Sequence, residues 1–148
     1  MKLWHVDILP YLPKTQLKDL WKLLNKMYTS QLKDIHINYA YYDHRSFYKY
    51  SLCVIEELYA HNIKISLDNF NKYFDDVWNE YDILQTTVHN YRTHILNPFY
   101  IQHDDEFLGI CYFDLKEQYM YSQKDFTRQE WENLNKHIKF VALREQRL

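Results

Sequence analysis

The chain has 148 residues, with one glycine, three prolines and a formal net charge of −2. This length is typical of one domain that buries a sizeable core without disulfides, and its longest apolar runs fall far short of the ~20 residues that span a bilayer. We therefore expect a soluble, cytoplasmic protein with no membrane partner. A single glycine leaves few positive-φ turns for β-hairpins and rules out a glycine-rich phosphate loop, so the composition predicts an all-α fold.

Charge is distributed unevenly along the chain. Residues 1–50 hold eight Lys and Arg against four Asp and Glu, whereas residues 51–148 hold ten against sixteen. Proteins that bind nucleic acid usually carry a basic surface. Only the first third of this chain is expected to provide one.

The first thirteen residues combine a free amine with an apolar arm. An α-amine has a pKa of about 7.7–8.0, so part of it is a neutral nucleophile at neutral pH. Lys2 is too large for routine removal of the initiator methionine, and no signal sequence is recognisable, so Met1 is expected to be the N-terminus. Pro10 and Pro13 restrict φ and favour an extended arm. The amine is either a reagent or simply the end of an arm whose apolar side chains pack in the core.

Residues 14–29 have apolar side chains at three- and four-residue spacings, which predicts an amphipathic helix. Lysines recur at every fourth position of this segment: Lys14, Lys18, Lys22 and Lys26. Such a stripe is either a solvated helix face or a row that follows phosphates.

Residues 30–43 are expected to form a loop. The stretch 38–50 interleaves aromatic rings with basic side chains, among them Tyr42, His44 and Arg45. That pattern suits the stacking of bases beside phosphate contacts. The alternative is that half of these rings pack inward.

A second long helix is predicted from about Arg45 to His61, with Asn62 as a left-handed cap. Because its apolar density is high, it is expected to be the central helix. A third amphipathic segment runs to about Tyr81 behind a cap at Ser66 or Asp68. Residues 82–103 show no period, and the histidine spacings there match no zinc motif, so no metal is expected.

The C-terminal third predicts two more helices. The first covers about 104–119 and opens on two aspartates that suit the positive end of a helix dipole. The last begins with a capping box between Thr127 and Glu130, with Phe126 placed to pack on Trp131, and extends to Val141 or beyond. No repeat or linker interrupts the chain, so one domain over residues 1–148 is expected.

Few catalytic chemistries fit these residues. No serine elbow motif is present, and Cys53 and Cys111 lie in apolar helical patterns typical of reduced core residues in an intracellular protein. No cofactor is implied. What remains is the terminal amine, together with a carboxylate that moves protons beside it.

The opening Met-Lys-Leu-Trp-His and the segments 9–14, 37–39, 47–50, 54–58 and 103–108 resemble the pyrimidine-dimer DNA glycosylases of the phage endonuclease V type. The resemblance implies a compact helical domain whose N-terminal arm threads into the core. It also implies glycosylase and AP-lyase activity, in which the amine of Met1 attacks a sugar carbon and forms an imine. The DNA-binding side chains expected from the resemblance and the basic segments are Lys2, His5, Lys14, Lys18, Lys22, Tyr42, His44 and Arg45.

The sequence departs from this family at the catalytic acid. Lys22 and Leu23 stand where the family carries an Arg-Glu pair, and Ser51 stands where it has a histidine. Asp19 lies one turn before Leu23 on the same helix face and is the candidate replacement. Two interpretations follow: a DNA glycosylase and lyase that uses Met1, or a non-catalytic relative that binds DNA or a protein partner.

Overall fold

The computed structural model describes residues 2–74, 100–121 and 126–146, with side chains up to residue 138. Helices and no strands are found over these ranges, so the all-α prediction is confirmed. None of the described helices is long and apolar enough to cross a membrane. The elements are η1 (Leu9–Tyr11), α1 (Lys14–Ser30), η2 (Asn38–Tyr42), α2 (His44–Ala60), α3 (Asp68–Tyr73), α5 (Asp105–Tyr121) and α6 (Arg128–Gln146).

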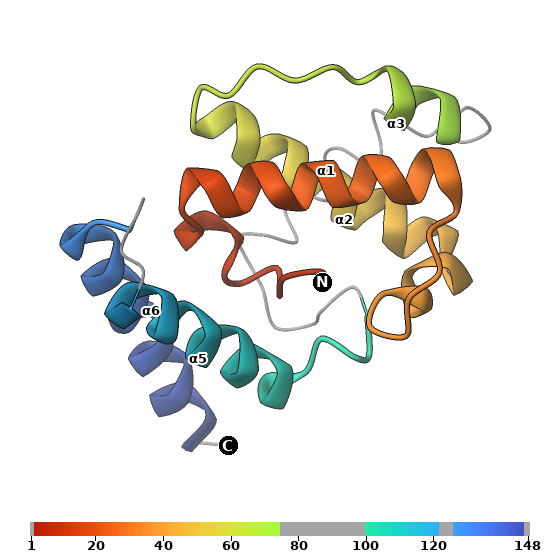
Figure 1. Cartoon of the computed structure of the whole chain (residues 1–148). Coiled ribbons are helices and arrows are strands. Elements are labelled where there is room, and N and C mark those ends of the chain that lie inside the picture. The colour runs from red at the N-terminus through yellow and green to blue at the C-terminus, as the bar shows by residue number, and fades with distance from the viewer. Residues whose placement is uncertain (1, 75–99, 122–125, 147–148) are drawn as a thin grey trace.

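The helices form two groups with the N-terminal segment between them (Figure 1). Helix α1 packs against α2 and α3, and α6 packs against η1. Helix α5 lies on the other side of the N-terminal segment from α1 (Figure 1). The first residues of the chain therefore face both groups of helices.

Helix α1 confirms the helix predicted over 14–29. Its apolar positions recur every three or four residues and are buried: Leu17, Leu20, Trp21, Leu24, Met27 and Tyr28. The helix ends at Gln31, which adopts the left-handed conformation with φ 48°. Just before it, the Thr29 and Ser30 hydroxyls donate to main-chain carbonyls one turn back, at 2.9 and 2.6 Å.

The N-terminal segment is buried from Leu3 to Leu9. The Tyr50 hydroxyl on α2 donates to the Trp4 carbonyl at 2.6 Å, which ties this segment to the central helix. The segment is not extended throughout, because Pro10 lies in the 3₁₀ turn η1. A proline in the first turn of a helix has no N–H to leave unpaired.

Residues 30–43, expected to be a loop, contain the 3₁₀ helix η2. An Asx turn precedes it, in which the Asp34 carboxylate accepts from the His36 N–H at 2.8 Å and the Asn38 side chain accepts from the Asp34 N–H at 2.8 Å. Ile37 and Ala40 are buried. The sequence prediction missed η2 because short 3₁₀ turns show no helical period.

Helix α2 is the most buried of the described helices, as expected of the central one. The Asp43 carboxylate caps its start by accepting from the Ser46 N–H at 3.1 Å. Asn62, with φ 58°, follows its end, and the Ile63 N–H donates to the Leu58 carbonyl at 2.9 Å. The predicted left-handed cap is therefore confirmed.

Helix α3 begins at Asp68 and ends at Tyr73. Residues 75–81 of the predicted third segment lie outside the described ranges, as do His89 and His94. Cys53 and Cys111 are buried and unlinked by a disulfide, which agrees with their expected place in the core.

Helix α6 starts with the predicted capping box. The Glu130 N–H donates to the Thr127 hydroxyl at 3.2 Å, and the Glu130 carboxylate accepts from the Thr127 N–H at 3.1 Å. The Phe126 ring lies 5.9 Å from the Trp131 ring, as the staple requires. Trp131 also stacks on Tyr119 at 5.1 Å, which joins α6 to α5.

Candidate functional site

A groove with a volume of about 450 Å³ is lined by side chains of α1, of Gln118 on α5 and of the first residues of the chain. Its walls are Lys2, Trp4, Gln16, Asp19, Leu20, Lys22, Leu23, Lys26 and Gln118. We call it the α1–α5 groove. The lining contains three lysines and one carboxylate, so its charge favours an anionic ligand.

The spacing of residues on α1 explains which of its side chains line the groove. Gln16, Asp19, Leu23 and Lys26 lie three or four residues apart and therefore share one face of the helix. The Gln16 side-chain amide Nε2 donates to the side-chain oxygen Oε1 of Gln118 on α5 at 2.8 Å. This hydrogen bond joins the two walls of the groove.

Lys2 carries the most constrained charge at the groove. Its ammonium forms an ion pair with Asp114 on α5 and lies 4.6 Å from the centre of the Trp4 ring, where a cation is attracted to the aromatic face. Burial lowers the pKa of Lys2, whereas the Asp114 carboxylate favours the charged form. An amine and a carboxylate are thus held together beside the groove.

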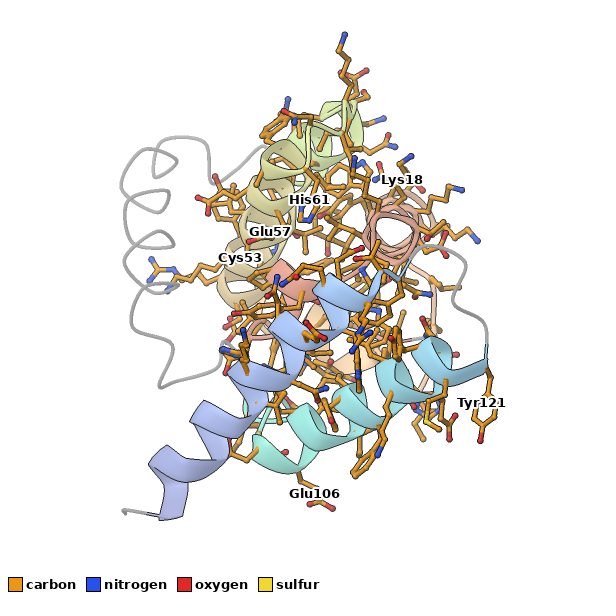
Figure 2. All side chains as sticks on the ribbon, turned by 90° about the vertical axis from the view of Figure 1, so that its left-hand side faces the viewer. Lys18, Cys53, Glu57, His61, Glu106 and Tyr121 are labelled. Atoms are coloured by element: carbon orange, nitrogen blue, oxygen red, sulfur yellow. The ribbon has the colours of Figure 1, made fainter. Side chains whose placement is uncertain are left out.

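The structure brings three of the predicted site residues together: Lys2, Asp19 and Lys22 all line the groove. Lys14 and Lys18 are exposed and lie outside its lining. Figure 2 shows Lys18 on the side of α1 that faces away from α5. The lysine stripe therefore contributes only its second half to the groove.

Leu23 also lines the groove, at the position where the resemblance expects a glutamate. Asp19 lies one turn before it, and a turn of α-helix rises ~5.4 Å. A carboxylate is therefore present in the lining, but it is displaced from the expected place. Lys26, Gln16 and Gln118 are further lining residues that were not predicted as site residues.

His5, predicted to contact DNA, is in the core instead. It is 4% exposed, and its ring stacks on His103 at 5.8 Å between centres. Burial lowers the pKa of His5 to about 4 and that of His103 to about 3. A buried, neutral imidazole presents no charge to a phosphate, so His5 lies apart from the basic side chains of the groove.

Tyr42, His44 and Arg45 are exposed but lie outside the groove lining. Tyr42 lines a second open pocket of about 510 Å³ with Gln31, Lys33, Asn38, Tyr41 and Tyr73. The His44 ring packs 5.0 Å from that of Phe74. The residues predicted for base stacking thus lie outside the α1–α5 groove.

Ser51, where the family carries a histidine, is fully buried and accepts a hydrogen bond from Tyr28 at 2.6 Å. It takes no part in the groove. No group of three or more potential metal ligands occurs among residues 2–74, 100–121 and 126–138.

Met1, the predicted nucleophile, lies outside the described residues, although its neighbour Lys2 lines the groove. Comparisons with protein-family models, with curated proteins and with solved structures find no match to this chain. The residues of the groove are therefore the basis for a functional assignment.

Proposed function

We propose that this protein binds damaged DNA along the α1–α5 groove, as a divergent relative of the pyrimidine-dimer DNA glycosylases. The observation that supports the proposal is the clustering of Lys2, Lys22 and Lys26 in one groove at the start of the chain. Lysine ammonium groups neutralise phosphates, and that term dominates the affinity of most DNA-binding proteins.

The proposed reagent is the α-amine of Met1. Consecutive Cα atoms are 3.8 Å apart, so residue 1 is tied to Lys2 and its groove. The neutral amine attacks the sugar carbon of a damaged nucleotide, the base leaves, and an imine forms. Asp19 is the carboxylate in the groove lining that accepts protons in place of the glutamate absent at Leu23.

Borohydride trapping tests the chemistry. The protein is incubated with duplexes that contain an abasic site or a pyrimidine dimer and is then reduced, which converts an imine to a stable secondary amine. We expect a covalent adduct on Met1 and none with an undamaged duplex. An intact-mass measurement first establishes that the chain used begins at Met1, and absence of an adduct with both lesions would remove the enzymatic part of the proposal.

A salt series tests the binding part separately. Each lysine that neutralises a phosphate contributes about −0.9 to the slope of log affinity against log salt concentration. We expect a steep loss of DNA affinity between 50 and 200 mM salt. Weak binding that is indifferent to salt would contradict a role for the groove lysines.

The second candidate is a non-catalytic relative that binds a protein partner. Four large apolar side chains on α5 are 51–81% exposed: Ile110, Phe113, Met120 and Tyr121. Exposed apolar side chains gathered on one helix are typical of protein interfaces. Under this interpretation, DNA affinity is absent and the substitution Phe113→Ser abolishes capture of the partner.

A further inference from the structure

The second open pocket, of about 510 Å³, is separate from the α1–α5 groove, and the described residues that line the two do not overlap. We call it the tyrosine pocket, and its described lining is Gln31, Lys33, Asn38, Tyr41, Tyr42 and Tyr73. Its volume is within the range of small-molecule sites. We infer that this pocket binds a nucleotide, with the base stacked on its tyrosine rings and the phosphate at Lys33.

The tyrosine rings of the pocket differ in how firmly they are held. Tyr41 and Tyr73 each pack edge-on against the buried Phe47 ring, with ring centres 6.1 and 5.7 Å apart. Tyr42, by contrast, is 86% exposed, so most of its ring is open to a ligand. Every base has a flat face that stacks on an aromatic side chain. Two supported rings and one open ring therefore suit a planar base.

The pocket is built where three elements end or begin, at the carboxyl end of α1 (Figure 1). Gln31 is the left-handed residue that ends α1, and Tyr73 is the last residue of α3. Tyr41 and Tyr42 belong to η2. Segments far apart in the sequence thus supply the rings, and their packing on the core places them in one hollow.

The polar side chains of the pocket match the rest of a nucleotide. The Asn38 side-chain oxygen accepts from the Asp34 N–H at 2.8 Å, which orients its amide. Gln31 adds a second amide, and such amides pair with the edge of adenine. Lys33 is the one charged side chain among the described lining residues, so the pocket attracts an anion and disfavours a cation.

A nucleotide reaches this pocket either as a free molecule or as one unit of a single strand, since both present a base beside a phosphate. The test titrates the full chain by calorimetry with two probes, adenosine 5′-monophosphate and a single-stranded oligodeoxyadenylate. Binding of the monophosphate identifies a free nucleotide as a ligand. Binding of the oligonucleotide alone identifies a strand as the source.

The first variant tests the open ring. Tyr42→Ala removes a stacking surface from an exposed position, so the affinity for whichever probe binds is expected to fall by about fivefold or more. The matched control is Tyr121→Ala, which removes an exposed tyrosine from α5 and leaves the affinity unchanged. Equal affinities for Tyr42→Ala and the wild type would overturn the stacking role.

The second variant separates the phosphate from the base. Lys33→Gln is expected to weaken the binding of adenosine 5′-monophosphate and to leave the weaker binding of adenosine unchanged, because only the former carries a phosphate. Lys18→Gln, on an exposed lysine of α1, is the control and alters neither affinity. Loss of both ligands in Lys33→Gln would contradict a phosphate at this side chain.

The remaining outcomes separate this inference from the proposed function, on which it does not depend. Binding of neither probe, or binding that Lys26→Gln in the groove weakens and Tyr42→Ala does not, overturns the tyrosine pocket as a nucleotide site. Tighter binding of choline than of adenosine 5′-monophosphate also overturns it, because aromatic rings recognise quaternary ammonium groups as well. Borohydride trapping at Met1 is expected to be the same in Tyr42→Ala and the wild type, so each proposal fails on its own measurement.

Discussion

Two residues of the N-terminal segment, Lys2 and His5, show how differently one short stretch of chain is used. Lys2 lines the open groove, with its ammonium between Asp114 and Trp4. His5 lies inside, stacked on His103. Three positions apart, one side chain lines an open groove and the other belongs to the core. Burial, and not position along the chain, decides which of these basic side chains is open to a ligand.

The largest expected effect concerns the buried histidines, His5 and His103, and is a loss of stability at acidic pH. The pKa of His5 is lowered to about 4 and that of His103 to about 3, because burial disfavours the imidazolium. For His5, burial outweighs the opposing charges of Asp104 and Asp105. The unfolded chain, with histidine pKa values of about 6.5, takes up protons first as the pH falls. Stability is therefore full above about pH 6.5 and is lost as the pH falls toward the two folded-state values.

From pH 7 to 5 we expect a loss of about 2 kcal/mol in the free energy of unfolding for each of the two histidines. Urea unfolding at the two pH values measures it. His103→Gln is expected to reduce the loss by about half, whereas the exposed control His36→Gln leaves it unchanged. An identical pH dependence in all three proteins would contradict the buried, neutral cluster.

The next largest effect concerns the α1–α5 groove and is a gain in cleavage rate when a carboxylate is added to its lining. Leu23→Glu places a carboxylate in the groove where the resemblance expects one, and positioned acid–base groups contribute about 10²–10⁴-fold to rate. We expect strand cleavage at an abasic site to rise by about 10²-fold or more. The isosteric control Leu23→Gln gives no such rise, and equal rates for the two variants would show that the groove is not the site of elimination.

A smaller effect concerns the hydrogen bond that joins the N-terminal segment to α2. Tyr50→Phe removes the hydroxyl that donates to the Trp4 carbonyl, leaving that buried acceptor unpaired at a cost of about 1–2 kcal/mol. Thermal unfolding measures this loss. The control Tyr59→Phe, on an exposed side chain of the same helix, is expected to unfold at the wild-type temperature. Equal melting temperatures for both variants would show that the hydrogen bond does not hold the segment.

The smallest effect separates the two halves of the lysine stripe. Lys26→Gln removes a cation from the groove lining, so the salt slope of DNA binding is expected to become shallower by about 0.9. Lys18→Gln alters a lysine that faces away from α5 (Figure 2) and leaves the slope unchanged. The reverse result would place DNA on the outer face of α1.

Sequence alone predicted the features that depend on neighbours along the chain. The period of α1, the cap at Asn62 and the capping box at Thr127 all involve residues within about five positions of one another. It could not predict the pair of Lys2 with Asp114 or the stack of His5 on His103. Those contacts join the first residues to the last third, and their lysine and histidines carry no local signal of burial.

The groove itself was partly predictable. Asp19 and Lys22 follow from the helix period once the resemblance draws attention to Leu23, and the structure places all three in one lining. Gln118 and Asp114 belong to α5, which packs beside the first residues of the chain (Figure 1). This packing joins segments that are far apart in the sequence, so the local sequence does not predict it. The division of the stripe into groove and outer face likewise depends on where α5 lies.

The most direct test of the central claim is the mapped borohydride adduct on an abasic duplex. We expect one labelled peptide, residues 1–6, with the DNA remnant on an amine at the groove. Its yield is expected to fall as salt is raised and to vanish on an undamaged duplex. No adduct, or one distributed over exposed lysines such as Lys14 and Lys18, would contradict it.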